Sequence, residues 1–359
     1  MRLQWDLFCR VIDNFGDVGV AWRLAADLAG RGQRVRLWID DASALAWMAP
    51  GGAPDGVEVL RWEAASEPGV QVGDIVIETF GCELPAAFVA RMAERGSQGL
   101  PAPHWLNLEY LSAEPYVERS HGLASPQYSG PGRGLDKHFF YPGFSARTGG
   151  LLREPGLLAE RERFDGAAWL AARGLARQRG ERVVSLFAYA NPQLPALLDL
   201  LAADPAQPTL LLVCPGSAQQ QLALQAPRPH LRWQALPYLS QPDYDRLLWA
   251  SDLNFVRGED SFVRAQWAGQ PFVWQIYPQE DGAHAPKLGA FLDLFLAAAG
   301  PALAAATRAL WRGWNGLADW PAALPEMAES RAQALLWRAH LAAQPDLASQ
   351  LLSRFGVSG

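Results

Sequence analysis

Two aspartates four residues apart, Asp13 and Asp17, are the side chains whose placement most favours chemistry. They enclose Asn14-Phe15-Gly16, and this loop joins an apolar run at residues 7–12 to a helical pattern at residues 18–28. The apolar run predicts a buried strand, and the carboxyl ends of such strands form the ligand crevices of open α/β sheets. Asp17 could act only as the N-cap of the helix. Asp13 has no comparable structural explanation, so we interpret it as facing a bound or reacting group.

A second loop, Arg257 to Ser261, also follows an apolar strand and precedes a helix. Gly258 permits a tight turn or the close approach of a ligand, and Asp260 or Ser261 could cap the helix. The N–H groups at the helix start, together with Arg257, could bind a phosphate. Glu259 would then face something else, such as a sugar hydroxyl or a cation. In isolation a capped helix with a surface Arg–Glu pair explains this loop better, but the matching acidic loop in the first half favours a nucleotide diphosphate site.

Aromatic side chains follow other predicted strands of the second half. Phe187 and Tyr189 come at the end of one strand, and Tyr238 lies in the short loop after another. Aromatic faces at such an edge could stack on a base, and the amide of Gln241 could contact the edge of that base. The sequence contains neither a Gly-x-Gly-x-x-Gly motif after the first strand nor a Gly-Lys-Ser motif, which disfavours dinucleotide and ATP sites.

The elements that must position these residues alternate between strands and helices. Because the strands are separated by helical segments, we expect parallel sheets with helices on both faces. The fold class is therefore α/β, with two Rossmann-like doubly wound domains facing a central cleft. The predicted strands lie at residues 7–12, 34–39, 57–62, 74–79, 105–110, 182–187, 209–214, 231–236, 253–256 and 272–276.

The chain is too long for one ordinary core, so two domains are expected. The first covers residues 1–160 and the second residues 180–330. The last helices, at about residues 331–359, are expected to pack partly back on the first domain. Residues 121–134 are rich in glycine and proline and predict a long surface loop.

The composition bounds the class of protein. Hydrophobic residues make up 50% of the chain and charged residues 19%, which is typical of a soluble globular protein. The net charge of -6 makes a broad nucleic-acid surface improbable. The three cysteines fall in or beside apolar runs without metal-ligand spacing, which fits reduced thiols in a cytoplasmic protein. We see no signal peptide and no run long enough for a membrane span, so we expect no membrane binding.

Several segments resemble one bacterial family, the protein-arginine rhamnosyltransferases that modify elongation factor P (the EarP family), which has the GT-B glycosyltransferase fold. The resemblance covers essentially the whole chain. The matching segments are residues 13–20 (Asp-Asn-Phe-Gly-Asp-Val-Gly-Val), 187–192 (Phe-Ala-Tyr-Ala-Asn-Pro), 257–267 (Arg-Gly-Glu-Asp-Ser-Phe-Val-Arg-Ala-Gln-Trp) and 271–279 (Pro-Phe-Val-Trp-Gln-Ile-Tyr-Pro-Gln).

The resemblance implies transfer of rhamnose from dTDP-β-L-rhamnose to an arginine of elongation factor P, with inversion and without a metal or other cofactor. It implies that Asp13, Asp17 and Glu259 are catalytic. It further implies that Arg257, Asp260 and Ser261 hold the diphosphate, while Phe187, Tyr189, Tyr238 and Gln241 line the thymidine pocket; Asn14, Phe15, Gly16 and Gly258 complete the substrate-binding set. At the position of Tyr238 some members carry phenylalanine, and either ring can stack.

The chemistry is consistent with these residue types. A guanidinium is a poor nucleophile because it stays protonated and its lone pairs are delocalised. One carboxylate near the attacking nitrogen can accept its proton, and a second can grip the other nitrogens. On the donor side, N–H groups at a helix start and Arg257 can stabilise the leaving diphosphate. A single displacement needs no protein nucleophile, and the sequence shows no convincing Ser/His or Cys/His arrangement.

Two other functions remain open at this point. A GT-B enzyme that acts on a small molecule or glycan would have a narrow acceptor pocket and would not bind elongation factor P. A non-catalytic nucleotide-sugar sensor would bind the donor without turnover, and Asp13→Asn would leave that binding unchanged.

Overall fold

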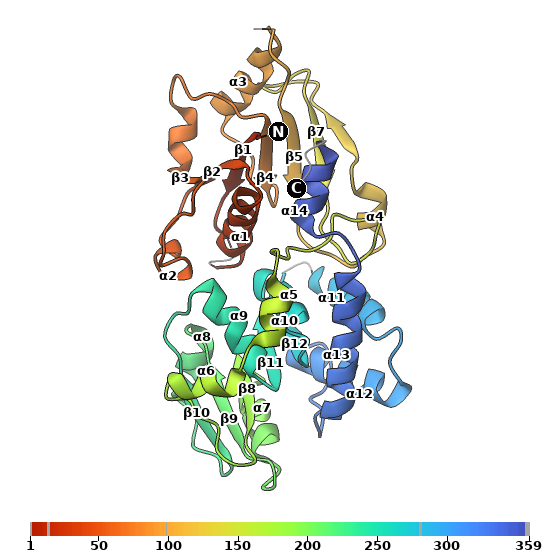
Figure 1. Ribbon diagram of the computed structural model, residues 1–359. Helices are drawn as coiled ribbons and strands as arrows, with labels where there is room; N and C mark the ends of the chain where they lie inside the picture. The colour runs from red at the N-terminus through yellow and green to blue at the C-terminus, as the bar shows by residue number, and fades with distance from the viewer. Residues whose placement is uncertain (1, 13–14, 98, 280–281, 356–359) are drawn as a thin grey trace. The chain divides into compact units, whose positions relative to one another are not determined.

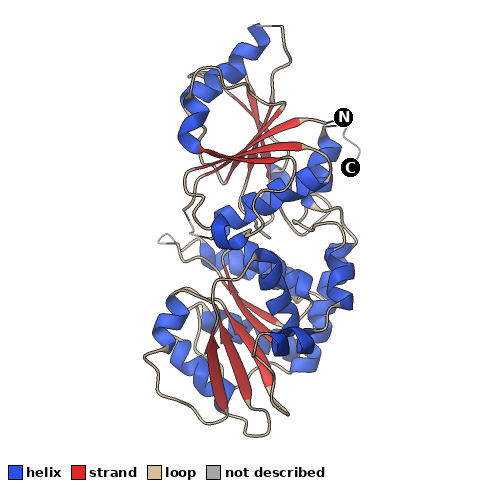
Figure 2. Ribbon diagram, turned by 60° about the vertical axis from the view of Figure 1, so that its left-hand side comes forward, coloured by secondary structure: helices blue, strands red, loops and turns tan. Residues whose placement is uncertain are grey.

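The structure is a computed structural model, and it describes residues 2–12, 15–97, 99–279 and 282–355. The chain divides into two compact units (Figure 1). The first unit comprises Met1–Pro155 and Leu341–Gly359, and the second comprises Gly156–His340. Each unit contains one β-sheet with helices on both faces (Figure 2). This is the α/β, Rossmann-like architecture that the alternation of strands and helices predicts.

The first unit contains a seven-stranded sheet. Its elements are β1 (Gln4–Cys9), α1 (Gly16–Gly30), β2 (Arg34–Ile39), α2 (Leu45–Met48), β3 (Val57–Arg61), the 3-10 helix η1 (Trp62–Ser66), β4 (Ile75–Thr79), α3 (Ala86–Ser97), β5 (His104–Leu108), α4 (Tyr116–Ser120), β6 (Ala124–Pro126), β7 (Asp136–Phe140) and α14 (Leu347–Arg354).

The strand order of the first unit places a topological switch point between β1 and β4. The order is β3-β2-β1-β4-β5-β7-β6, and every neighbouring pair is parallel except β6 with β7. From β1 the chain moves outward through β2 and β3, then returns to β4 and moves outward in the other direction. The loops after β1 and β4 therefore diverge at a topological switch point, which is where open α/β sheets bind ligands.

Both faces of this sheet are covered by apolar side chains. On one face the core includes Leu24 of α1 and Leu351 of α14, both fully buried. On the other face Phe8 stacks on Trp38 and meets Phe88 of α3 edge to face. Strands buried on both faces are the reason these segments are continuous apolar runs rather than alternating patterns.

The C-terminal helix α14 belongs to the first unit, where it lies beside α1 (Figure 1). Arg31, just after α1, forms two ion pairs. Its Nε lies 2.8 Å from Oδ1 of Asp27 in α1, and its Nη2 lies 2.8 Å from Oδ1 of Asp346, the N-cap of α14. Most of the preceding helix, α13 (Met327–Ala342), is part of the second unit. The return to the first unit begins at Leu341.

The sequence prediction was wrong about the end of the first strand. The apolar run extends to Ile12, but β1 ends at Cys9. Val11 leaves the sheet because its N–H donates to Asp40 Oδ1 at 2.9 Å, and the side chain of Ile12 is 65% exposed. Residues 10–12 thus lie outside the sheet, between the end of β1 and α1.

The segment at residues 121–134 is not entirely a loop. It contains β6, which pairs antiparallel with β7 so that Ser125 lies opposite Lys137. Pro126 ends β6, and a proline is tolerated there because β6 is the edge strand and needs no N–H donor on its open side. The high proline and glycine content concealed this short hairpin.

The second unit contains a five-stranded parallel sheet in the order β10-β9-β8-β11-β12, so that its switch point lies between β8 and β11. Its elements are α5 (Leu157–Arg163), α6 (Gly166–Ala172), β8 (Arg182–Leu186), α7 (Leu194–Ala202), β9 (Thr209–Val213), α8 (Ser217–Leu222), β10 (Leu231–Ala235), α9 (Gln241–Ala250), β11 (Leu253–Arg257), α10 (Asp260–Ala268), β12 (Phe272–Gln275), α11 (His284–Phe295), α12 (Pro301–Trp314) and most of α13.

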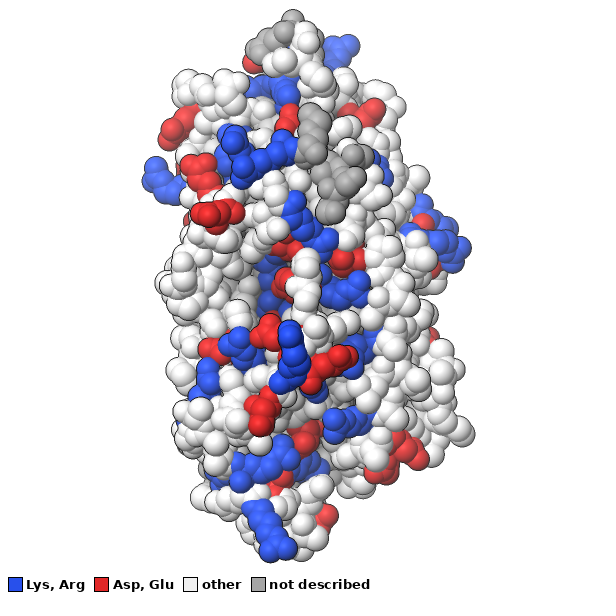
Figure 3. Space-filling model, viewed as in Figure 1, with Lys and Arg blue, Asp and Glu red and all other residues white. Residues whose placement is uncertain are grey.

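Charged side chains of both signs are interspersed on the face drawn in Figure 3. Among the described residues, no helix is both long enough and apolar enough to cross a membrane. The three cysteines, Cys9, Cys82 and Cys214, are buried and unpaired with one another.

Candidate active site

The loop after β1 places a buried carboxylate at the switch point of the first unit. Asp17 is 3% exposed, and its Oδ2 accepts a hydrogen bond of 2.9 Å from the N–H of Ile12. This contact joins the end of the segment after β1 to the first turn of α1. Asp13 and Asn14 lie outside the described residues, so their predicted roles stay predictions.

Asp17 is not the N-cap of the following helix. The N-cap is Phe15, without a side-chain hydrogen bond, and Asp17 lies in the first turn of α1. Gly16 begins the helix, and the ring of Phe15 meets Trp47 of α2 edge to face at 5.1 Å. Phe15 therefore anchors the loop to α2, a structural role beside its predicted contact with substrate. Because Asp17 does not cap the helix, its burial calls for another explanation.

Asp17 influences the electrostatics of its surroundings. Burial raises the pKa of the Cys9 thiol well above its usual value, and the negative charge of Asp17 raises it further. The Cys82 thiol, after β4, has its pKa raised to about 12 by burial and by Glu78. Both thiols stay protonated at neutral pH, so neither supplies the thiolate that nucleophilic catalysis requires.

In the second unit the switch point holds an arginine between aromatic side chains. Arg257 ends β11 and is 8% exposed. Its guanidinium carbon lies 4.4 Å from the ring centroid of Phe187 and 4.5 Å from that of Tyr189, both just after β8. Cations at these distances are attracted to ring faces. The two rings, predicted to face a base, thus also orient Arg257, a role that the sequence did not suggest.

Gln275, the last residue of β12, and Tyr277, two residues further on, support this cluster. The sequence analysis assigned neither of them. The side-chain oxygen of Gln275 accepts a 2.9 Å hydrogen bond from the N–H of Tyr189. The ring of Tyr277 meets the ring of Tyr189 edge to face at 5.5 Å. Both residues lie in the segment 271–279 that carried the family resemblance, so a signal for them was present.

Glu259 forms an ion pair with Lys287 of α11. The two side chains approach to 3.0 Å between Nζ and Oε1, and they are 17% and 18% exposed. This lysine is the cation that the sequence analysis left unidentified as a possible neighbour of Glu259. It was missed because it lies 28 residues away on another helix.

The turn between β11 and α10 differs from the predicted helix cap. Gly258 has a φ of +61°, a backbone conformation that glycine adopts readily. The N-cap is Glu259, whose side chain makes no capping hydrogen bond to the helix, and Asp260 begins α10. Ser261 does not cap the helix either: its hydroxyl accepts from the N–H of Arg257 at 3.1 Å and donates to the carbonyl of Arg257. Ser261 therefore fixes the end of β11 and with it the arginine.

The remaining predicted residues follow β10, at the same edge of the sheet. Tyr238 is 51% exposed, and Gln241 is buried as the first residue of α9. The helix cap here is Ser240, whose side chain accepts from the N–H of Asp243 at 3.2 Å. An exposed ring beside a buried amide is compatible with base recognition from solvent.

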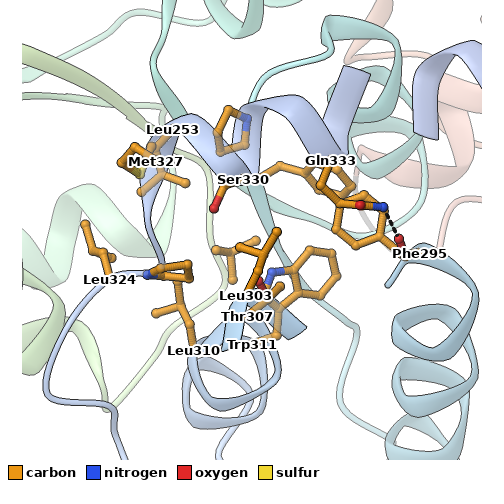
Figure 4. Close-up of a pocket in the computed structure, with 14 residues that line it drawn as sticks. Leu253, Phe295, Leu303, Thr307, Leu310, Trp311, Leu324, Met327, Ser330 and Gln333 are labelled. Carbon is orange, nitrogen blue, oxygen red and sulfur yellow. Dashed lines mark hydrogen bonds between the residues drawn. The ribbon is translucent and has the colours of Figure 1, made fainter. Parts of the chain in front are cut away.

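An apolar cavity of about 30 Å³ lies at the opposite edge of this sheet (Figure 4). It is lined by Leu253 and Phe272, the first residues of β11 and β12, and by Gln333, whose side-chain N–H₂ donates to the carbonyl of Phe295. A volume of this size holds about one water molecule. The cavity is therefore separate from the cluster around Arg257. Among the described residues, no group of three or more His, Cys, Asp or Glu is arranged to hold a metal ion.

Comparison with solved structures defines the class of protein. The chain is similar to spinosyn rhamnosyltransferase in complex with thymidine diphosphate, with a TM-score of 0.51 and 14% identity. It is equally similar to MurG of Acinetobacter baumannii, with a TM-score of 0.51 and 15% identity. Each match covers 99% of both chains. The fold is that of the GT-B glycosyltransferases.

The family follows from closer relatives. The family model for elongation factor P rhamnosyltransferase, EarP, matches residues 5–355. Protein-arginine rhamnosyltransferases of Pseudomonas aeruginosa and Pseudomonas putida are 47% and 48% identical to the chain, over 97% and 98% of it and 98% of each relative. A solved structure that explains EarP-mediated arginine glycosylation of elongation factor EF-P has a TM-score of 0.68 and 36% identity over 99% of both chains. The chain belongs to the EarP family of protein-arginine rhamnosyltransferases.

Proposed function

We propose that this chain transfers rhamnose from dTDP-β-L-rhamnose to an arginine of EF-P, with inversion at the anomeric carbon. Membership of the EarP family supports the reaction class, and a 36% identical solved relative acts on EF-P. The observation that carries the donor assignment is the position of Arg257, held between two rings at the switch point of the second unit.

The donor side of the reaction needs positive charge that is fixed in place. The diphosphate gains negative charge as the bond to rhamnose breaks, and preorganised donors stabilise that charge in the transition state. Arg257 supplies one such group, and the N–H groups in the first turn of α10 supply others. We assign Asp260 and Ser261 to the same diphosphate region, and Tyr238 and Gln241 to the thymidine base.

Glu259 is suited to orient the sugar rather than the diphosphate. Its carboxylate is held by Lys287 at 3.0 Å, which offsets the repulsion it would exert on a nearby phosphate. A carboxylate that is held in this way can accept hydrogen bonds from rhamnose hydroxyls. We therefore propose that Glu259 holds the rhamnose in the transition state. Lys287 is a positioning residue that fixes the carboxylate of Glu259.

The acceptor side of the reaction needs negative charge. We assign Asp13 as the general base that removes a proton from the attacking guanidinium nitrogen. Asp17, buried and bonded to the N–H of Ile12, orders the loop and contributes a second negative charge toward the cationic acceptor. Asn14, Phe15 and Gly16 complete that loop. We propose no cofactor, since the donor is a substrate. We further propose that the enzyme acts in the cytoplasm, together with EF-P.

The test uses purified protein, dTDP-β-L-rhamnose with labelled rhamnose, and purified EF-P. Label should appear on EF-P, and it should disappear when the acceptor arginine is changed to lysine or when Asp13→Asn enzyme is used. Transfer to small molecules or glycans but not to EF-P would show that the acceptor is wrong. Donor binding without transfer to any acceptor would show a sensor. Calorimetry with UDP- and GDP-sugars checks the base, because tighter binding of either one would overturn the donor assignment.

A further inference from the structure

Aromatic residues follow three neighbouring strands of the first unit, beside the loop that carries Asp17. Phe80 comes directly after β4, Tyr110 two residues after β5, and Tyr141 directly after β7. These strands are adjacent and parallel, so their carboxyl ends lie along one edge of the sheet. We call Phe80, Glu109, Tyr110 and Tyr141 the acceptor ledge.

The rings of Phe80 and Tyr110 are stacked, and the backbone of Phe80 is held in a strained conformation. The centroids of Phe80 and Tyr110 lie 4.4 Å apart with 13° between the planes. Phe80 has a φ of +58°, which is unfavourable for a bulky side chain. Strain of this kind persists only where the surroundings impose it, and it concentrates at functional sites. Tyr110 is 38% exposed, so the residue lies at the surface of the unit and not in its core.

A buried amide fixes the carboxylate of the ledge. Asn107, 4% exposed, donates from its side-chain nitrogen to Glu109 Oε1 at 2.6 Å and accepts from the N–H of Gly81 at 3.0 Å. One side chain therefore ties the loop after β4 to the loop after β5. Burial, and then the negative charge of Glu109, raise the pKa of Tyr141 to about 12. Tyr141 consequently stays neutral, and Glu109 supplies the negative charge of the ledge.

This combination of groups matches the chemistry of arginine. A guanidinium is planar and weakly hydrated, stacks on aromatic faces, and pairs with carboxylates. The ledge also lies close enough to the end of β1 for one bound segment to reach both places. Since neighbouring strands are about 4.8 Å apart, the end of β5 lies roughly 10 Å from the end of β1, with β4 between them.

We propose that the acceptor ledge binds the arginine-bearing segment of EF-P, with Tyr110 stacking against that segment and Glu109 countering its positive charge. The inference rests on the proposed function and extends it, because it names the surface that selects the acceptor. Phe80 and Asn107 are positioning residues: Phe80 supports the ring of Tyr110, and Asn107 aims the carboxylate of Glu109.

The test measures initial rates of rhamnose transfer at saturating dTDP-β-L-rhamnose while the concentration of EF-P is varied. Tyr110→Ala should raise the KM for EF-P about tenfold, or about 1.4 kcal/mol of binding free energy, with kcat within twofold. Tyr110→Phe, which keeps the ring, should stay within twofold of wild type in both. Glu109→Gln should raise the KM severalfold and weaken its dependence on salt.

Donor affinity, measured by calorimetry for each variant, separates this proposal from a general structural effect. It should be unchanged, because the ledge and the cluster around Arg257 lie in different units. A KM within twofold of wild type for both Tyr110→Ala and Glu109→Gln would overturn the ledge while leaving the proposed function intact. An equal loss of donor affinity in both variants would also overturn it. Failure of the wild-type enzyme to modify EF-P would instead refute the proposed function.

Discussion

Replacing Lys287 by methionine tests whether the ion pair in the second unit serves the reaction. Methionine keeps most of the length and the apolar body of the side chain but removes its charge. Glu259 would then lose the Nζ atom that now lies 3.0 Å from its Oε1. If Lys287 positions this carboxylate for the donor, its removal should reduce transfer even though Lys287 itself contacts neither diphosphate nor acceptor in our assignment.

The magnitude follows from the burial of the pair. Fully exposed ion pairs contribute about 0.2–1 kcal/mol, whereas removal of one partner from a fully buried pair costs about 3–5 kcal/mol. The side chains of Lys287 and Glu259 are 18% and 17% exposed, so they lie between these limits. We expect a loss of about 1–3 kcal/mol, which corresponds to a roughly 5- to 150-fold fall in kcat/KM.

The assay is a double-mutant cycle on kcat/KM for the donor with Lys287→Met, Glu259→Gln and both changes together. Because the lysine acts through the carboxylate, Lys287→Met should have little further effect in the Glu259→Gln enzyme. The matched control is Arg308→Met, which removes an exposed 2.8 Å pair with Asp293 on the same helix as Lys287 and should leave transfer unchanged. Effects of the two changes that simply multiply, or a Lys287→Met enzyme within twofold of wild type, would refute the reasoning.

Three further predictions concern Arg257 and two buried carboxyl groups, one in each unit. Arg257→Lys keeps the charge but loses the planar stack against two rings, and calorimetry should show dTDP binding weaker by about 1–2 kcal/mol. Asp245→Asn breaks the buried ion pair with Arg264 of α10, in which two nitrogens of the arginine lie 2.9 and 2.7 Å from the two carboxylate oxygens. The change should lower the free energy of unfolding by about 3–5 kcal/mol. Calorimetry should show the melting temperature of the second unit lowered by about 6–20 °C. Burial raises the pKa of Asp27 to about 6 from its usual 3.8, despite bonds to Arg31. The folded chain thus binds this proton more tightly than the unfolded chain, so the contribution of this carboxyl to the free energy of unfolding falls as pH rises from 4 to 6. In urea unfolding, Asp27→Asn should remove this decrease with pH.

The arrangement of strands and helices was predictable because it depends on apolar runs that are visible in the chain. The ends of those runs were less informative. The run that contains β1 continues to Ile12, and nothing in its hydrophobicity indicates that Asp40, on a neighbouring loop, captures the N–H of Val11. The edge strand β6 was hidden for a related reason, since its proline is permitted only by its place in the sheet.

The site was predictable in its loops but not in its partners. Parallel strands bring their carboxyl ends to one edge, and Arg257 meets Phe187 and Tyr189 at that edge. The sequence assigned the two rings to a base and did not suggest these contacts. The pairing of Glu259 with Lys287 depends on how α11 packs, which no local pattern encodes. By residue type alone Asp260 or Ser261 could cap the helix, whereas the hydroxyl of Ser261 bonds to the backbone of Arg257.

The switch points of the two units carry charged groups of opposite sign, and this difference supports the proposed placement of the two substrates. In the second unit the fixed charge at the sheet edge is Arg257, while the carboxylate of Glu259 is offset by Lys287. That arrangement favours a diphosphate and disfavours a guanidinium. In the first unit Asp17 and Glu109 are both acidic, and the neighbouring rings of Phe80 and Tyr110 favour a planar cation. Exchanging the substrates between the units would place like charges together at both edges, which supports the proposal that the donor binds the second unit and the arginine the first.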